Sequence, residues 1–143
     1  MNNNCLIIGA GNLGSQIALG YDSWHTGKRV EKIYIYDINQ KKEKIFKHSK
    51  HIVFVKDLSN VLKKSKFIIL AVKPKDYKDV CARIKDHLKK KTIIVSLMAG
   101  IKINSLKREL PNNSQFVRIM TNLNISVFQG SSFIYANNKI KNI

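Results

Sequence analysis

The sequence predicts an α/β fold, namely a doubly wound, mainly parallel sheet with helices on both faces. Short apolar segments alternate along the chain with segments whose apolar residues recur at helical spacing. The short segments are hydrophobic at nearly every position, which is typical of strands buried on both faces of a parallel sheet. A glycine-rich loop follows the first of them directly, and right-handed crossovers then favour the doubly wound arrangement.

The first part of the chain predicts a strand, a helix and a second strand. Residues 5–8, Cys-Leu-Ile-Ile, form a continuous apolar run that ends at a glycine. The segment after the loop carries apolar residues at helical spacing, namely Leu13, Ile17, Ala18 and Tyr21. Gly27 fits a break after this helix. Residues 33–36, Ile-Tyr-Ile-Tyr, are β-branched and aromatic, and they predict the second strand.

The remaining elements repeat the alternation. A third strand is expected at 52–55, and Asp57 can cap a short helix that runs to Lys64. The strongest strand of the chain is expected at 67–72, before an amphipathic helix from Lys75 to Lys90. The elements expected after it are a strand at 92–97, a helix at 103–110, a strand at 116–120 and a last short strand at 132–135.

Length and composition indicate one domain with a true core. The chain has 143 residues, 44% of them hydrophobic. No apolar run reaches the roughly 18 to 20 residues that cross a bilayer. The polar residues 1–4 lead into a segment too short for a signal peptide, so we expect a cytoplasmic protein without a membrane partner. Cys5 and Cys81 are expected to be buried free thiols, and no metal site is predicted.

The charge is strongly positive, with 26 Lys and Arg against 9 Asp and Glu and a formal net charge of +17. One hypothesis is a protein that binds nucleic acid or another anionic surface. We favour a compositional explanation, because the lysines are scattered in short groups without the interleaved aromatic residues that stacking platforms require. Nucleic-acid binding therefore stays the less favoured alternative.

The loop at residues 9–14, Gly-Ala-Gly-Asn-Leu-Gly, is the expected phosphate cradle of a Rossmann-type dinucleotide-binding domain. It follows a predicted strand and opens a predicted helix, which is the context that makes this motif informative. Its first glycine permits a tight turn, the second lets the backbone approach a pyrophosphate, and the third lets helix and sheet pack closely. The helix N-terminus favours the negative charge. The residues expected to hold the cofactor here are Gly9, Ala10, Gly11, Asn12, Leu13 and Gly14. The alternative is a glycine-rich turn without a ligand.

Asp37 is expected to bind the adenine ribose of the cofactor. It follows the predicted second strand, about 20 residues after the glycine loop, where a carboxylate can accept hydrogen bonds from both ribose hydroxyls. A carboxylate would repel the 2′-phosphate of NADP, so Asp37 favours NAD over NADP. Two alternatives stay open: Asp37 caps a helix that begins near Asn39, or Lys41 and Lys42 accommodate a phosphate.

Three further segments resemble a known family. They read Ile-Leu-Ala-Val-Lys-Pro at 69–74, Val-Ser-Leu-Met-Ala-Gly-Ile at 95–101 and Val-Arg-Ile-Met-Thr-Asn at 117–122. In this order, after the glycine loop, they resemble the cofactor domain of pyrroline-5-carboxylate reductases. That family reduces 1-pyrroline-5-carboxylate to proline with NAD(P)H. We expect residues 1–130 to form this dinucleotide-binding domain and residues 131–143 to form a short C-terminal segment or tail.

The resemblance implies a cofactor-binding rim on two neighbouring strands. The first part would lie along the nicotinamide ribose, and its residues are Ala71, Val72, Lys73 and Pro74. They end the central strand, where open α/β sheets bind ligands. Lys73 can meet a phosphate or a substrate carboxylate, and the alternative is an exposed loop lysine. Ser96 and the Ala-Gly pair at 99–100 either shape the nicotinamide pocket or serve ordinary turn chemistry.

The third segment departs from the family, which usually reads Met-Pro-Asn-Thr-Pro where this chain has Met-Thr-Asn-Leu-Asn at 120–124. Asn122 is retained and is expected to hydrogen-bond the ribose or carboxamide of the cofactor. The loop lacks both prolines and their rigidity, so we expect substrate positioning to be affected more than cofactor binding.

Enzymes of this family continue into a helical domain that forms the dimer and supplies most of the substrate pocket. This chain ends soon after the cofactor domain, at Ile143. Three explanations stay open: a truncated gene, a second polypeptide that supplies the missing half, or another use of the domain.

The expected function is NAD(P)H-dependent reduction of 1-pyrroline-5-carboxylate to proline, with this chain as the cofactor-binding domain and a small imino acid as the substrate. No residue is singled out as catalytic, because the four histidines have no carboxylate at a motif spacing. The sequence also has no nucleophile elbow and no cluster of metal ligands. The alternatives are a non-catalytic or degenerate NAD(P)-binding module, for example a regulatory subunit, and the nucleic-acid-binding protein considered above.

Overall fold

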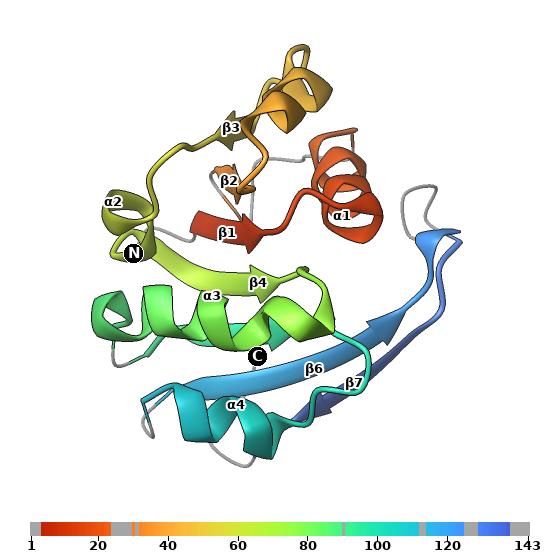
Figure 1. Cartoon of the computed structure of the whole chain (residues 1–143). Helices are drawn as coiled ribbons and strands as arrows, with labels where there is room; N and C mark the ends of the chain where they lie inside the picture. The colour runs from red at the N-terminus through yellow and green to blue at the C-terminus, as the bar shows by residue number, and fades with distance from the viewer. Residues whose placement is uncertain are drawn as a thin grey trace.

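The computed structural model describes residues 4–23, 30, 32–89, 91–111, 114–124 and 129–137. Its centre is a seven-stranded sheet with the strand order β3-β2-β1-β4-β5-β6-β7 (Figure 1). The strands are β1 (Asn4–Ile8), β2 (Ile33–Tyr36), β3 (Ile52–Phe54), β4 (Ser65–Leu70), β5 (Ile93–Ser96), β6 (Gln115–Thr121) and β7 (Ser132–Ala136). The pairs from β3 to β6 are parallel, and β7 runs antiparallel to β6. The predicted doubly wound, mainly parallel sheet is therefore confirmed.

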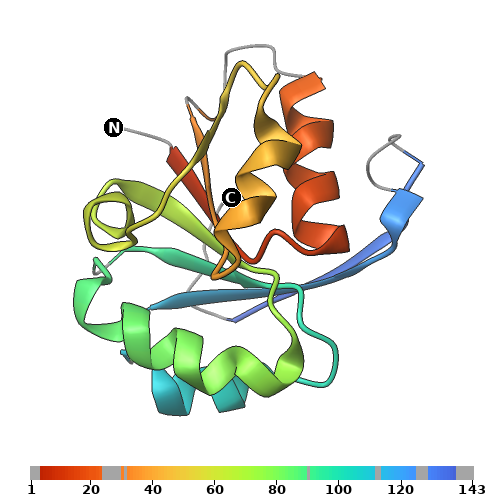
Figure 2. The same cartoon turned by 45° about the horizontal axis from the view of Figure 1, so that its top comes forward.

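Helices cover both faces of the sheet (Figure 2). The α-helices are α1 (Asn12–Ser23), α2 (Ser59–Leu62), α3 (Tyr77–Ile84) and α4 (Ile103–Glu109), and the 3₁₀ helices are η1 (Gln40–Phe46), η2 (Pro74–Asp76) and η3 (Lys85–His87). Alternate residues of β1 pack into the two hydrophobic cores, one on each face of the sheet. Leu6 and Ile8 pack with α2, α3 and α4, whereas Cys5 and Ile7 pack with α1 and η1. No helix among the described residues is long and apolar enough to span a membrane.

The sheet register places three strand ends at one edge. Ile8 of β1 is paired with Tyr36 of β2 and with Leu70 of β4, and each of these residues is the last of its strand. Parallel strands that end together leave a crevice beyond their carboxyl ends, between the connections that lead away to the two faces. The fold therefore brings the glycine loop, the end of β2 and the end of β4 together.

Several element boundaries differ from the predictions, including the short helix expected from Asp57 to Lys64, which is α2 with Leu58 as its N-cap, and two of the differences bear on the site. The central strand was expected at 67–72, but β4 ends at Leu70 because its partner β1 ends at Ile8, and Ala71 and Val72 form the loop beyond it. The helix expected from Lys75 has an α-helical part only over α3, with η2 before it and η3 after it. Pro74 starts η2, which suits its missing N–H group. Lys90 and Gly27 lie outside the described residues.

The helix expected near Asn39 exists as η1, and Asn39 is its N-cap. The Asn39 side chain accepts a hydrogen bond from the Lys41 backbone N–H at 3.1 Å. Asp37 is therefore not the cap of this helix. At the C-terminal end, β7 corresponds to the short strand expected at 132–135 and pairs with β6 in the main sheet, and residues 138–143 are outside the described part.

Both cysteines are buried free thiols, as predicted. Burial raises the pKa of Cys5 to about 12. Burial, with a smaller contribution from the charge of Glu109, raises the pKa of Cys81 to about 11. A thiol must ionise to act as a nucleophile, so neither cysteine is suited to that role.

Candidate functional site

The chain turns sharply at Gly9, directly after β1. Gly9 has a φ of +106°, and a Cβ there would lie 2.6 Å from the carbonyl oxygen of Ala71. Its N–H donates to the carbonyl oxygen of Tyr36 at 2.8 Å, which ties the loop to the end of β2. A residue with a side chain fits neither the backbone conformation nor the space. Glycine at position 9 is therefore a requirement of the protein's own packing.

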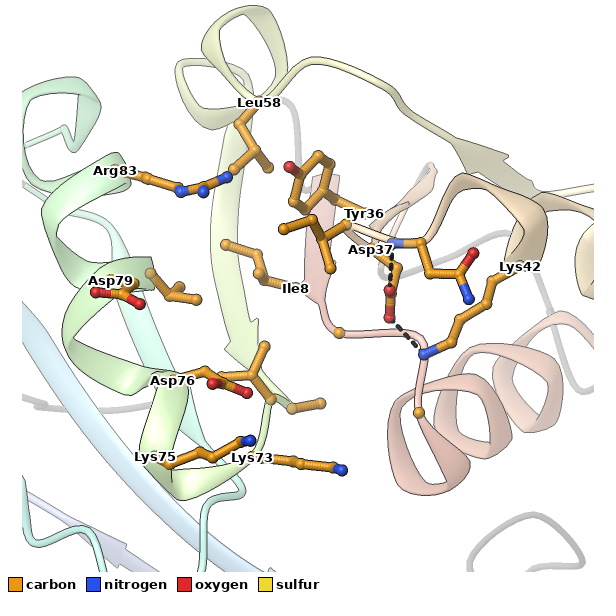
Figure 3. Close-up of a pocket in the computed structure, with 17 residues that line it drawn as sticks. Ile8, Tyr36, Asp37, Lys42, Leu58, Lys73, Lys75, Asp76, Asp79 and Arg83 are labelled. Carbon is orange, nitrogen blue, oxygen red and sulfur yellow. Dashed lines mark hydrogen bonds and ion pairs between the residues drawn. The ribbon is translucent and has the colours of Figure 1, made fainter.

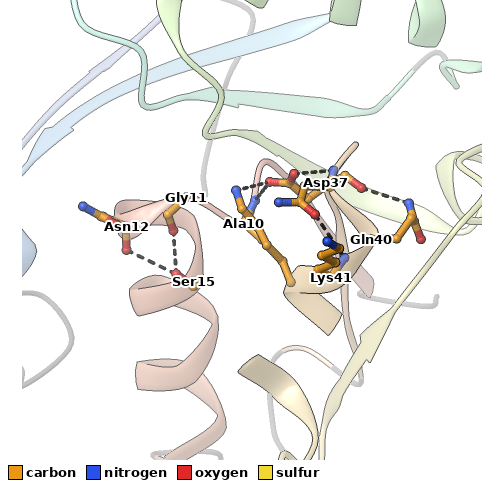
Figure 4. A network of polar contacts seen from close by, with 9 residues as sticks. Ala10, Gly11, Asn12, Ser15, Asp37, Gln40 and Lys41 are labelled. Atoms are coloured by element: carbon orange, nitrogen blue, oxygen red, sulfur yellow. Dashed lines mark hydrogen bonds and ion pairs between the residues drawn. The ribbon is translucent and has the colours of Figure 1, made fainter. Parts of the chain in front are cut away.

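Gly14 is the point where α1 touches the loop. A Cβ at Gly14 would collide with the carbonyl oxygen of Gly9, and it would lie 3.1 Å from the Cβ of Ala71. Ser15, the next residue, donates its hydroxyl to the carbonyl oxygen of Gly11 (Figure 4). The first turn of α1 is thereby fixed against the end of the sheet.

Gly11 differs from its two neighbours in the motif. A Cβ built at Gly11 would meet no atom within 4 Å, so the packing of the described residues does not explain a glycine there. The N–H groups of the first helical turn have no acceptor within the helix, and α1 has no acidic residue in its first turn. An anion at this helix end would meet N–H donors, the positive end of the helix dipole and an open backbone. The loop therefore fits a phosphate group.

Asp37 holds the loop, the end of β2 and η1 together (Figure 4). Its Oδ2 accepts hydrogen bonds from the Ala10 backbone N–H and from the Lys42 ammonium group, both at 2.8 Å. Its Oδ1 accepts one from the Asn39 N–H, also at 2.8 Å. The residue is only 8% exposed. Burial alone would raise the pKa of this carboxyl, but the hydrogen bonds from Lys42, Asn39 and Ala10 outweigh it, and the pKa of Asp37 is lowered.

Replacing Asp37 with asparagine is expected to lower the free energy of unfolding by about 2 kcal/mol at pH 7, because an amide is a weaker acceptor for these donors. The pKa of Asp37 is lower in the folded chain, so its contribution is fully present above the ordinary aspartate pKa of about 3.9 and is lost as the pH falls through the folded value. Urea unfolding of the wild type and Asp37→Asn from pH 7 to pH 2 measures this.

The matched control is Glu43→Gln, which removes an exposed ion pair with Lys56 at 3.6 Å and is expected to have little effect. The stability gap between the wild type and Asp37→Asn should close as the medium becomes acidic. A gap that is constant over the whole pH range would contradict the role given to the ionised carboxylate.

A pocket of about 460 Å³ opens beside the loop (Figure 3), which is within the usual size range of ligand sites. One wall is made by the ends of β1 and β2 with Asp37 and Lys42, and the opposite wall is made by η2 and α3. Basic and acidic side chains line it together, namely Lys42, Lys73, Lys75 and Arg83 with Asp37, Asp76 and Asp79. Apolar side chains complete the lining, including Ile8, Leu58, Val72 and Val80.

The pocket brings together about half of the predicted site residues. Those that line it are Gly9, Gly11, Asp37, Ala71, Val72 and Lys73. The others do not line the pocket: Ala10 belongs to the loop, Asn12, Leu13 and Gly14 begin α1, and Pro74 opens η2. Asn122 lies apart, exposed just beyond the end of β6.

Ser96 and Gly100, which belong to the second part of the predicted cofactor-binding rim, both show turn geometry. Ser96 is fully buried, and its hydroxyl accepts a hydrogen bond from the Met98 N–H at 3.4 Å. Gly100 has a φ of +75°, a conformation that favours glycine. Within the described residues, no three His, Cys, Asp or Glu side chains gather as metal ligands.

The sequence interpretation missed the wall formed by α3. Asp79, Val80 and Arg83 of α3 line the pocket together with Asp76, the N-cap of this helix, and Arg83 lies three or four positions after the other two helical residues. The signal was present as helical spacing, but only the apolar stripe of this helix was considered. Lys42, which was expected as one of two lysines able to accommodate a phosphate, forms an ion pair with Asp37 in the structure.

The fold and the glycine loop are those of the nucleotide-binding domain of oxidoreductases. Residues 5–100 match the family described as "NADP oxidoreductase coenzyme F420-dependent", and the chain belongs to this family. Its curated relatives include the pyrroline-5-carboxylate reductases of Aquifex aeolicus, 34% identical over 134 residues, and of Staphylococcus aureus (strain COL), 31% identical over 125 residues. The matches cover 94% and 85% of this chain but only 48% and 45% of the relatives. The predicted resemblance is confirmed, and the chain spans about half the length of these relatives.

Solved structures show the same fold. The pyrroline-5-carboxylate reductase of Coxiella burnetii superposes with a TM-score of 0.87 at 26% identity, over 99% of this chain and 52% of that chain. The Plasmodium falciparum pyrroline carboxylate reductase, solved with NADP bound, superposes with a TM-score of 0.82 at 20% identity, over 98% of this chain and 50% of that chain.

Proposed function

We propose that this chain is the cofactor-binding domain of a pyrroline-5-carboxylate reductase and takes part in the NAD(P)H-dependent reduction of 1-pyrroline-5-carboxylate to proline in the cytoplasm. The main support for this proposal is the glycine loop. A side chain at Gly11 would meet no atom within 4 Å, which leaves room for a ligand, whereas Gly9 and Gly14 are required by the packing of the protein itself. The names of the curated relatives support the reaction. Reduced nicotinamide supplies the hydride when bound, and the residues of this chain bind and orient it.

The walls of the pocket support one placement of the cofactor. We propose that the pyrophosphate lies at Gly11 and the first turn of α1, with the adenine ribose beside Asp37 and the adenine against Leu58 and Val80. The nicotinamide ribose would then lie along Ala71 to Pro74, with Asn122 further along the same rim. Exclusion of water from the reacting carbon requires a cover over this end of the pocket.

We propose that the site prefers NAD over NADP, because Asp37 is a carboxylate at the ribose. Lys42 reduces the preference, since its ammonium group lies 2.8 Å from Asp37 Oδ2 and can turn to a 2′-phosphate. Its side chain is partly exposed and lines the pocket. The chain is therefore expected to bind both cofactors, with NADH tighter by up to about tenfold.

Replacing Lys42 with methionine is expected to weaken NADPH binding by about tenfold and to change NADH binding by less than about twofold, because only NADPH carries the 2′-phosphate. Titration calorimetry with both cofactors measures this. The matched control is Lys44→Met, an exposed lysine of η1 that does not line the pocket. A wild-type chain that binds NADPH more tightly than NADH would contradict the preference, and equal losses for both cofactors would contradict the role of Lys42.

The reaction itself is tested by following NAD(P)H oxidation in the presence of 1-pyrroline-5-carboxylate. The chain alone is expected to bind NADH without turnover, and turnover is expected when a polypeptide that matches the other half of the relatives is added. Absence of NADH binding would overturn the proposal. NADH binding without proline formation in the completed assembly would instead favour a non-catalytic module.

A further inference from the structure

Arg83 of α3 lies on the border between two pockets. It lines the pocket of about 460 Å³ beside the glycine loop, and it also lines a smaller pocket of about 200 Å³. Tyr36 and Leu58 are likewise shared by both pockets, which are therefore neighbours. In Figure 3, Arg83 and Leu58 lie at one end of the larger pocket, and Lys73 lies at the opposite end. Arg83 thus belongs to the end of the pocket that is away from the rim at Lys73.

This end of the pocket combines two apolar walls with a planar cation. Val80 is three positions before Arg83 on α3, and both residues line the larger pocket, so they belong to the same wall. Leu58 belongs to the opposite wall, and in Figure 3 the Arg83 side chain extends from α3 toward it. A flat group held between Leu58 and Val80 would therefore also meet the guanidinium group of Arg83.

The guanidinium group of Arg83 is available to a ligand. Among the described residues, the salt bridges have Lys42 and Lys56 as their cations, and neither includes Arg83. Asp79 lies four positions before Arg83 on the same helix, a spacing at which Asp and Arg often pair, but the two side chains form no ion pair. Arg83 is also exposed to solvent. Neither an ion pair nor burial therefore explains the direction of its side chain.

The smaller pocket gives Arg83 no better partner. Its lining includes Asp57 and Lys56. The carboxylate of Asp57 is already engaged, because its Oδ1 accepts hydrogen bonds from the hydroxyl group of Ser59 at 2.8 Å and from the Ser59 N–H at 3.3 Å. Lys56 carries the same charge as Arg83 and disfavours its approach. The guanidinium group therefore gains most from a ligand in the larger pocket.

We propose that Arg83 gives the site a preference for adenine, by placing its planar guanidinium group against the base of the bound dinucleotide. Guanidinium groups stack on flat aromatic rings, and their N–H groups donate hydrogen bonds to ring nitrogens. A two-ring purine offers this group a larger face than a one-ring pyrimidine does. The inference rests on the proposed function, which places the adenine against Leu58 and Val80. Arg83 contacts no reacting atom, so it is a specificity-determining residue.

The test measures the affinity of the full chain for NADH and for the analogue that carries cytosine in place of adenine, by titration calorimetry. Arg83→Met keeps an apolar stem and removes the guanidinium group. This variant is expected to bind NADH about fivefold more weakly and the cytosine analogue less than about twofold more weakly. The matched control is Arg108→Met, which removes the same charge from an exposed residue of α4 outside both pockets and should leave both affinities unchanged.

Equal losses for the two dinucleotides, or no loss for NADH, would overturn the role of Arg83 and leave the proposed function in place. Absence of NADH binding by the wild type would instead overturn the proposed function, and this inference with it. Arg83→Lys keeps the charge without the planar group, so full NADH affinity in this variant would also overturn the proposal. In the wild-type complex, nuclear Overhauser effects are expected between the Arg83 side chain and the adenine ring protons of NADH, and their absence would contradict the contact with the base.

Discussion

Gly11→Ala is expected to weaken NADH binding at least tenfold while leaving the free energy of unfolding unchanged or slightly raised. The added methyl group meets no atom of the described chain within 4 Å, so the fold accommodates it, and alanine restricts the unfolded chain more than glycine does. The same methyl group occupies the space where a pyrophosphate must approach the backbone. Binding and stability should therefore respond to this substitution in different ways.

Fluorescence titration with NADH and urea unfolding, performed on the same preparation, measure both quantities. A Gly11→Ala chain that binds NADH as tightly as the wild type would show that no ligand approaches the loop there. A large loss of stability would show instead that the open space at Gly11 is occupied by parts of the chain outside the described residues.

Gly14→Ala is expected to have the opposite profile, with a loss of about 3 kcal/mol in the free energy of unfolding. The methyl group would collide with the carbonyl oxygen of Gly9, which is backbone and held by its neighbours, so the obstacle cannot rotate away. Helix α1 would have to move from β1, and NADH binding would fall as a consequence of the distorted loop. Thermal and urea unfolding measure the effect, with Gly11→Ala as the matched control. Equal stability of the two variants would contradict the packing described for Gly14.

The contrast between these glycines could not be predicted from the sequence. The motif assigns a role to each glycine. Only the structure shows that Gly9 and Gly14 pack closely against Ala71 and against each other, whereas Gly11 has open space beside it. Ala71 is more than fifty residues away along the chain, so no local pattern encodes that contact. The alternation of strands and helices did predict the sheet, because burial on both faces leaves a continuous apolar run in the sequence.

Asp37 also has contacts that could not be predicted from the sequence. Its position after β2 was predictable from the spacing to the loop, whereas its partners were not. The bond to the Ala10 N–H joins residues 27 positions apart and depends on how Gly9 turns the chain. The ion pair with Lys42 depends on η1, a 3₁₀ helix whose path is set by the Asn39 cap. The carboxylate expected to read a ribose therefore also holds the loop in shape.

The wall formed by α3 was missed for a different reason. An amphipathic pattern shows which residues face the core, but it does not show which of the remaining residues face a pocket. Arg83 and Asp79 were indistinguishable in sequence from the many exposed charged residues of this basic chain. Their position follows from β4 ending at Leu70, which lets η2 and α3 begin beside the crevice.

A titration of the ¹⁵N-labelled chain with NADH, followed by NMR, shows whether the loop between β1 and α1 holds a dinucleotide. Backbone amide shifts are expected to be largest at Gly11 to Gly14, with a second group at Ala71 to Lys73 and near Asp37. Absence of shifts at the loop at saturating NADH, or shifts confined to exposed lysines away from the pocket and lost on addition of salt, would contradict binding at the loop.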